Sequence, residues 1–237
     1  MKKRGVSHIE IIMAFILFIS AVAFVFIFIN PFATKNPTSA IEKYSLNELT
    51  NLLKTNITTY TLIISDNVND NAIAIDLGFT IPSAVNARAK YYSGIELPSG
   101  ISSDRNKVYL TWNKDNGHVV LISLSEEFEA YTPDPDIASL LPENKYQISS
   151  SVFFESISES KTSALEAEYF AQYSILKAEL NIPPQADFGF KLSLPGKTIA
   201  ANKIIPENIE VKSRNKIVRV VNPSGSQLLG NLEVSIW

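Results

Sequence analysis

The sequence contains no cysteine and only two histidines, His8 and His118. The absence of cysteine excludes disulfide bonds and thiolate metal sites. Neither histidine has a neighbour that would complete a catalytic triad, and the chain has no Gly-x-Ser-x-Gly nucleophile motif. We therefore expect no catalytic residues, no metal site and no cofactor, and we do not expect an enzyme.

Clustered positive charge is also missing from most of the chain. The formal net charge is −3 and the sequence pI is about 5.5. Beyond the first few residues, the lysines and arginines form no patch. Because nucleic-acid-binding proteins carry such a patch, we expect no nucleic-acid partner.

The acidic segments lack the spacing of known metal-binding motifs. The cluster Asp66–Asn71 has Val68 at its third position and an asparagine where an EF-hand requires glycine. Turn chemistry accounts for this cluster and for Asp134-Pro135-Asp136, because Asp and Asn bond to their own backbone in turns. Asp187-Phe188-Gly189 matches a kinase metal motif, but no glycine-rich loop or His-Arg-Asp accompanies it. We interpret it as a strand.

The most prominent feature of the sequence is a long apolar run behind a short basic head. The head, Lys2-Lys3-Arg4, precedes Gly5, and Glu10 follows five residues after that glycine. Ile11–Ile29 then contains Ser20 as its only clearly polar residue. Such a run rises about 28 Å as a helix, close to the hydrocarbon thickness of a bilayer. We therefore expect a single transmembrane helix here.

Three interpretations of this N-terminal segment are open. A cleaved secretory signal has an apolar core of about 7–15 residues and ends at a small-x-small site. The core here is longer, and no Ala-x-Ala follows it. A plain signal anchor accounts for the apolar run and the basic head, but it leaves Gly5 and Glu10 unexplained.

The third interpretation is a resemblance. The basic head, Gly5, Glu10 and the apolar helix together resemble the class III signal of type IV prepilins, a family of bacterial pilins, type II secretion pseudopilins, archaeal pilins and archaellins. Gly5 matches the last leader residue, Val6 the first mature residue, and Glu10 the glutamate at the fifth mature position. Bacterial pilins favour Phe where this chain has Val6, so the segment is more similar to archaeal members. The resemblance covers about the first thirty residues.

The resemblance implies specific roles for these residues. A membrane aspartyl peptidase, the prepilin peptidase, would cut between Gly5 and Val6 on the cytoplasmic side. Glu10 of one subunit would offset the new amine of Val6 in another. Val6 and Glu10 also share a face of one helix, so a pair within one chain is the alternative. Lys2, Lys3 and Arg4 place the head in the cytoplasm and the body outside by the positive-inside rule.

We divide the chain into a leader (1–5), a transmembrane and assembly helix (6–30), a proline-containing linker (31–38) and an extracytoplasmic α+β domain (39–237). Prolines at both ends of the linker interrupt the helix. A capping box, Ser39-Ala40-Ile41-Glu42, predicts a second helix that runs to about Lys54.

The rest of the chain is dominated by short β-rich segments. An Asn-Gly turn at Asn113–Gly117 predicts a hairpin between the strands that flank it, and we expect further hairpin turns at Ser213–Asn215 and Asn222–Gly225. The expected strands are Thr58–Ile64, Ala72–Phe79, Lys107–Trp112, His118–Ile122, Tyr146–Ile157, Asp187–Leu192, Asn208–Lys212, Lys216–Val221 and Leu232–Trp237.

A further helix is indicated after the capping box Ser163-Ala164-Leu165-Glu166. Its apolar side chains recur on one face, which contains Leu165, Tyr169, Tyr173, Leu176 and Leu180. We expect this face to lie on a sheet, with partner binding as the alternative. The predicted fold class is α+β: one N-terminal transmembrane helix, then a mainly-β extracytoplasmic domain with one or two packed helices. Asn56-Ile57-Thr58 is the chain's only N-glycosylation sequon, so Asn56 is a candidate glycosylation site on an exported domain.

From these patterns we expect a structural subunit, a major or minor pilin or pseudopilin, of a type IV pilus-like surface assembly. It would lie at the cell membrane, with its C-terminal domain outside. Its partners would be the membrane, the prepilin peptidase, other pilin-like subunits and the assembly platform. A stand-alone single-pass ectodomain for adhesion or ligand binding is the alternative. An extracytoplasmic enzyme is a third hypothesis, which would require a cleft of convergent acids or histidines.

Overall fold

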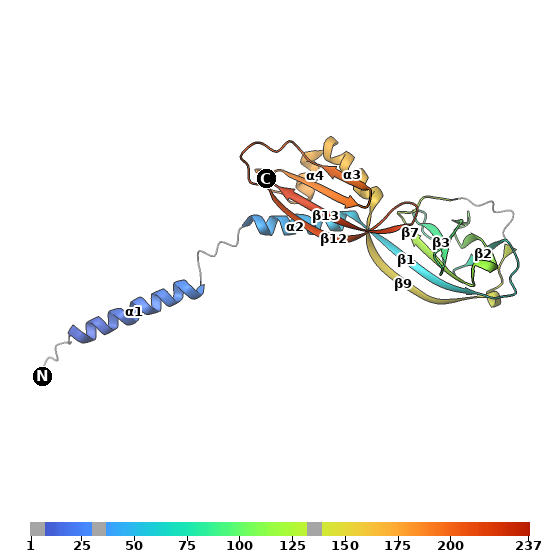
Figure 1. The fold of residues 1–237 in the computed structure, drawn as a ribbon, viewed down its shortest axis with the longest axis horizontal. Coiled ribbons are helices and arrows are strands. Elements are labelled where there is room, and N and C mark those ends of the chain that lie inside the picture. The colour runs from blue at the N-terminus through green and yellow to red at the C-terminus, as the bar shows by residue number, and fades with distance from the viewer. Residues whose placement is uncertain (1–7, 30–36, 132–138) are drawn as a thin grey trace. The chain divides into compact units, whose positions relative to one another are not determined.

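The computed structural model describes residues 8–29, 37–131 and 139–237 (Figure 1). The chain divides into two compact units, Met1–Ile41 and Glu42–Trp237. The expected leader, residues 1–5, and most of the expected linker, residues 31–38, lie outside the described residues. All of the described strands belong to the second unit.

The first unit contains α1, a helix of 22 residues from His8 to Ile29. The segment has no glycine or proline to interrupt a helix. A helix that crosses a bilayer needs about 20 predominantly apolar residues. None of the helices in residues 8–29, 37–131 and 139–237 is long and apolar enough for this. The expectation of a transmembrane helix is therefore wrong: a helix is present where it was expected, but it fails the requirement for a span.

The helix α2 runs from Pro37 to Leu53 and confirms the second helix expected from the sequence. Proline suits the first turn, where its missing N–H would have no partner. In the second unit, Leu46 and Leu49 are buried, whereas Tyr44 is 47% exposed. The buried face of α2 therefore includes these leucines and excludes Tyr44.

A nine-stranded sheet runs through the second unit in the order β11-β10-β13-β12-β9-β1-β7-β3-β4 (Figure 1). Within it, β9 and β12 are parallel and pair at only two positions, Ile157 with Val220 and Ser158 with Val221. The other neighbours are antiparallel. The strands are β1 (Lys54–Ile64), β3 (Asn86–Tyr91), β4 (Glu96–Leu97), β7 (Val119–Ser125), β9 (Tyr146–Ser158), β10 (Phe188–Leu194), β11 (Lys197–Ala201), β12 (Lys212–Val221) and β13 (Gln227–Ile236).

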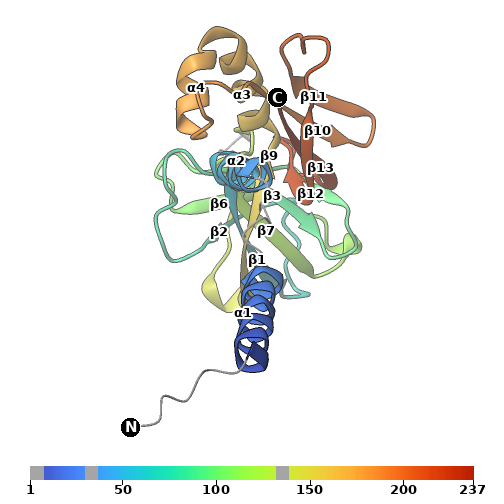
Figure 2. The same cartoon turned by 90° about the vertical axis from the view of Figure 1, so that its left-hand side faces the viewer.

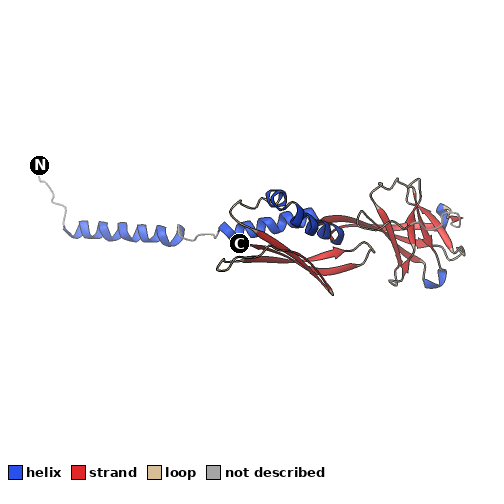
Figure 3. Ribbon diagram, turned by 90° about the horizontal axis from the view of Figure 1, so that it is seen from above, coloured by secondary structure: helices blue, strands red, loops and turns tan. Residues whose placement is uncertain are grey.

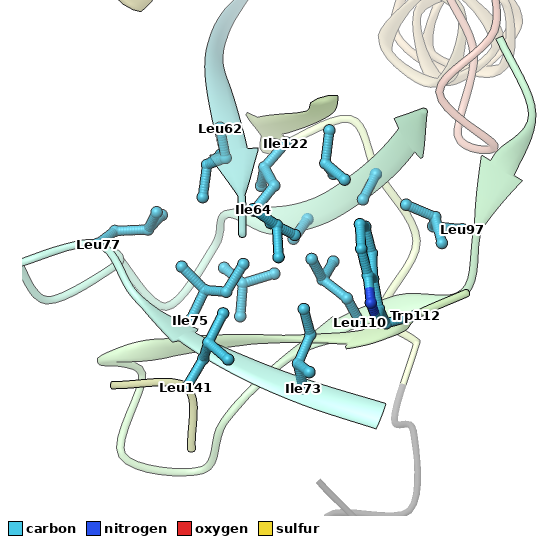
Figure 4. Packing of buried hydrophobic residues seen from close by; sticks show 14 of the residues in the cluster. Leu62, Ile64, Ile73, Ile75, Leu77, Leu97, Leu110, Trp112, Ile122 and Leu141 are labelled. Carbon is cyan, nitrogen blue, oxygen red and sulfur yellow. The ribbon is translucent and has the colours of Figure 1, made fainter. Parts of the chain in front are cut away.

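A second sheet of four strands, in the order β5-β6-β2-β8, packs against the half of the large sheet that contains β1, β7 and β3. Its strands are β2 (Ala72–Asp76), β5 (Ser99–Ile101), β6 (Lys107–Thr111) and β8 (Ser139–Leu140). Apolar side chains from both sheets fill the space between them (Figure 4). This core includes Leu62, Ile64, Ile73, Ile75, Leu110, Trp112 and Ile122.

The helices α3 (Glu159–Ala171) and α4 (Tyr173–Glu179) lie on one side of β10–β13 (Figures 2 and 3). The sequence predicted one helix starting near Ser163, and this prediction is wrong in two respects. The helix begins earlier, because the Ser158 hydroxyl caps it by accepting a hydrogen bond from the Lys161 N–H at 2.8 Å. It breaks at Gln172, whose φ is −138°.

The predicted apolar face of this helical region is confirmed. Leu165, Tyr169, Leu176 and Leu180 are between 0% and 7% exposed. They therefore form the buried side of α3 and α4, as expected for helices that lie on a sheet.

Two of the predicted hairpins are wrong, and one is confirmed. β6 belongs to the four-stranded sheet and β7 to the nine-stranded sheet, so the Asn-Gly segment connects two sheets. Ser213–Asn215 lies inside β12 and pairs with β13. The turn Asn222–Gly225 joins β12 to β13 as predicted, with the Gly225 N–H donating to the Asn222 carbonyl at 2.9 Å. Turn-forming residues mark where a chain can bend, but packing decides where it does.

The fold class also needs correction. Strands contain 41% of the residues and helices 27%, so the fold is mainly β rather than α+β. Several strands were not predicted, among them β3. Its sequence alternates Ala87 and Ala89 with Arg88 and Lys90, and alanine has a weak preference for strands. Burial of both alanines against the core nevertheless stabilises this strand.

Candidate assembly surface

The helix α1 exposes apolar side chains in every direction. Its side chains are described from Glu10 to Phe24, and nine large apolar ones are between 48% and 66% exposed. Successive helical residues are about 100° apart, so these nine surround the axis. A helix without a polar face is typical of a buried environment. The nine residues are Ile11, Ile12, Met13, Phe15, Ile16, Leu17, Phe18, Ile19 and Phe24.

Glu10 is the acidic residue in the first turn of α1, and its side chain is exposed. A carboxylate is favourable at this end of a helix, where unpaired N–H groups carry partial positive charge, by about 0.3–1 kcal/mol. The other residues of the expected signal, Lys2, Lys3, Arg4, Gly5 and Val6, lie outside the described residues. The expected pairing of Glu10 with Val6 therefore stays a prediction.

The sequon residue Asn56 lies in β1, opposite Glu155 of β9. Its side chain is exposed. Exposure is a requirement for glycosylation, so Asn56 remains a candidate modification site.

The side chain of His8 lies outside the described part of the structure. His118 lies with its Nδ1 3.4 Å from Oδ1 of Asp66. Both residues line a surface pocket of about 630 Å³ together with Glu143 and Tyr146. Within the described part of the chain, no group of three or more His, Cys, Asp or Glu side chains could hold a metal ion. The expected acidic pair Asp134 and Asp136 lies outside it.

A cluster of polar side chains surrounds Asp187, just before β10. The Tyr173 hydroxyl donates to Asp187 Oδ1 at 2.7 Å and accepts from the Phe188 N–H at 3.0 Å. Lys177 and Lys203 place their Nζ atoms 3.6 and 3.7 Å from the same Oδ1. These contacts fasten α4 to β10, so the Asp-Phe-Gly sequence has a structural role here.

The same contacts shift the pKa values of this cluster. The hydrogen bond from Tyr173, assisted by Lys203 and Lys177, holds the pKa of Asp187 below its ordinary value. Burial raises the pKa of Tyr173. Burial also raises the pKa of Tyr169 to about 12. These tyrosines therefore stay protonated at neutral pH and act as hydrogen-bond donors.

A second exposed surface, which was not predicted from the sequence, is the segment Ile204–Val211 between β11 and β12. A strand was expected from Asn208, but the backbone here is irregular. Four apolar side chains in this segment are exposed, and Ile204 is 95% exposed. The signal in the sequence was Pro206 directly after the apolar pair Ile204-Ile205, because proline disfavours regular structure in the residues before it.

Comparison with protein-family models, curated proteins and solved structures finds no match to this chain.

Proposed function

We propose that this chain is a structural subunit of a type IV pilin-like surface assembly, held together by packing of α1 against α1 of other copies. The observation that carries the proposal is the apolar surface around the whole circumference of α1. Water contact with this surface is unfavourable by about 25 cal/mol per Å². Other copies of α1 cover it with side chains of the same chemistry.

The N-terminal motif supports the pilin-like character of the assembly. Gly5, Val6 and Glu10 stand at the positions that the class III signal requires. The proposal therefore includes the prepilin peptidase, other pilin-like subunits and the assembly platform as partners, and the cell surface as the location. It does not include a helix that spans the membrane.

Glu10 sets the register of the proposed bundle. Burying a carboxylate among apolar helices costs several kcal/mol unless it is paired. Cleavage after Gly5 creates an amine on Val6, four residues before Glu10. A pair between Glu10 of one copy and Val6 of another is lost when the helices slide, so it fixes their axial offset.

The absence of native cysteine makes this proposal directly testable. Phe15→Cys places a single thiol on α1, and Phe170→Cys places a matched control on α3. The two native side chains are 64% and 66% exposed. Full-length protein is produced with a prepilin peptidase, collected from the cell surface and oxidised mildly. We expect disulfide-linked dimers with Phe15→Cys and few with Phe170→Cys.

Equal yields of dimer from the two variants would overturn the proposal, as would a protein that stays monomeric and uncrosslinked. A Phe15→Cys thiol that reacts only with a lipid-soluble reagent, without dimers, would show that lipid rather than other copies covers α1. That result would also overturn it.

A further inference from the structure

A notch separates the two halves of the large sheet. β9 and β12 diverge next to their two-residue contact, and the space between them has a volume of about 290 Å³. Three cations line it, Lys54, Lys216 and Arg219, against one carboxylate, Glu155. Glu155 is paired with Lys54, its Oε2 lying 2.7 Å from the Nζ atom. The notch therefore carries excess positive charge.

Exposed apolar side chains surround this charge. Ile217 is 75% exposed, Leu229 68% and Val152 54%. Arg219 lies opposite Leu229 in the pairing of β12 with β13. Its guanidinium is 5.2 Å from the ring centroid of Phe154. Arg219 thus has apolar side chains of β13 and β9 beside it.

The edge of β12 is also open on this side. Among the described strands, β12 has no neighbour opposite β13 except at Val220 and Val221. The backbone N–H and C=O groups along one side of Ser213–Val218 thus have no strand to bond, whereas the Arg219 carbonyl accepts a hydrogen bond from the Ser156 hydroxyl at 3.0 Å. An open edge of this kind accepts an extended segment by strand addition.

The segment Ile204–Val211 has the complementary chemistry. It exposes Ile204 (95%), Ile205 (42%), Ile209 (46%) and Val211 (39%). It carries two carboxylates, Glu207 and Glu210, and no basic residue. Glu210 is paired with the adjacent Lys212, whose Nζ atom lies 3.8 Å from its Oε1. Half of the residues of the segment are thus exposed and apolar, and Glu207 gives it a charge opposite to that of the notch.

We propose that the second units of neighbouring copies bind head to tail. Ile204–Val211 of one copy, the donating copy, docks in the notch between β9 and β12 of the next, the accepting copy. This inference rests on the proposed function, since it names a second contact in the same assembly. Val211 and Lys216, the first residue of β12 that lines the notch, are five residues apart, a span of roughly 17 Å along a strand. The segment therefore lies too far along β12 to fill the notch of its own chain, and its occupant is another copy.

The contact joins two different surfaces, so it is heterologous. A heterologous contact that does not close into a ring continues indefinitely and forms a filament. The second units would then be spaced along the filament with the same repeat as the packed α1 helices.

Mixed-disulfide formation tests this arrangement. Full-length Ile204→Cys and Ile217→Cys proteins, carrying different tags, are assembled together and oxidised. We expect the mixed 204–217 disulfide to exceed both symmetric products. Ile175→Cys, on an α4 side chain that is 52% exposed in the native protein, is the matched control partner for Ile217→Cys. The proposal would be overturned if the symmetric 204–204 or 217–217 disulfide formed in a yield equal to or greater than that of the mixed one.

Charge reversal provides the second arm. Lys216→Glu with Arg219→Glu in the accepting copy should abolish most of the mixed disulfide, as should Glu207→Lys with Glu210→Lys in the donating copy. Combining the two reversed copies should restore it. Thermal melting confirms that each variant folds. If one of them does not, the neutral changes Lys216→Gln and Arg219→Gln replace the reversal. Unchanged disulfide yield in the folded variants would contradict the role of charge.

The Phe15→Cys crosslink separates this inference from the proposed function. If dimers form through α1 while the 204–217 disulfide is absent, the head-to-tail contact is wrong and the proposed function stands. If neither crosslink forms, both are wrong. A 204 thiol that is captured only by an unrelated protein also overturns the inference.

Discussion

The Tyr173 hydroxyl donates a 2.7 Å hydrogen bond to Asp187 Oδ1, which ties α4 to the start of β10. The ammonium of Lys203 lies 3.3 Å from the centroid of the Tyr173 ring. The backbone of Asp187 also exchanges two hydrogen bonds with Trp237, at 2.7 and 3.0 Å. Asp187 therefore links a helix, a strand and the last residue of the chain.

This link predicts a loss of stability in acid. The folded pKa of Asp187 is held below its ordinary value, chiefly by the Tyr173 hydrogen bond. Asp187 therefore makes its full contribution to the free energy of unfolding above its unfolded pKa of about 3.9. This contribution is lost as the pH falls through the folded pKa. Because Asp187 is partly exposed, we expect a modest contribution, about 1 kcal/mol.

Thermal melting of wild type and Asp187→Asn at pH 7 and pH 3 measures this contribution. The variant should melt at a lower temperature than wild type at pH 7, and the difference should shrink at pH 3. Tyr173→Phe, which removes the donor, should behave in the same way. A difference that is independent of pH would contradict an ionised Asp187 as the cause.

Processing should occur between Gly5 and Val6. Glycine has no side chain to obstruct a peptidase, and the proposed function includes cleavage by a prepilin peptidase after this glycine. The intact mass of protein made with a prepilin peptidase should fall by the mass of Met1–Gly5. Gly5→Val should block the cut, whereas Val6→Phe should retain it. A mature N-terminus at Met1, or one beyond Asn30, would rule out this processing.

Glu10→Gln should reduce assembly without affecting the folded body. The amide keeps the shape of the side chain but removes the charge that would pair with the amine of Val6. We expect the same melting temperature as wild type and less Phe15→Cys dimer at the cell surface. Glu179→Gln, at an exposed position on α4, is the control. If Glu10→Gln assembled as well as wild type, the carboxylate would act only by stabilising the N-terminal end of α1.

Gly230→Ala should destabilise the second unit. A Cβ atom at this position in β13 would lie 2.8 Å from Leu194 Cδ2 and 3.1 Å from Val220 Cγ2. Overpacking of this kind typically costs about 1–3 kcal/mol. Urea unfolding monitored by tryptophan fluorescence measures the change, with Asn231→Ala in the same strand as the control. A free energy of unfolding equal to that of wild type would show that the neighbouring side chains move aside at no cost.

The sequence by itself determined the features that depend on local pattern. The apolar run without glycine or proline predicted a helix at α1, and the extended run Tyr146–Ile157 predicted β9 almost to its ends. The turn at Asn222–Gly225 followed from residues that favour bends. The candidate residues Gly5, Val6 and Glu10 also come from the sequence alone. They were identified by the order of a basic head, a glycine, an acidic residue and a long apolar run along the chain.

Only the tertiary structure decided which strands are neighbours. Alternation shows which side chains face a core, but backbone hydrogen bonds are the same for every strand and specify no partner. Thus β6 and β7 flank a strong turn signal and yet lie in different sheets. The notch at β9 and β12 and the exposed Ile204–Val211 arise in the same way, because pairing and burial depend on residues distant in sequence.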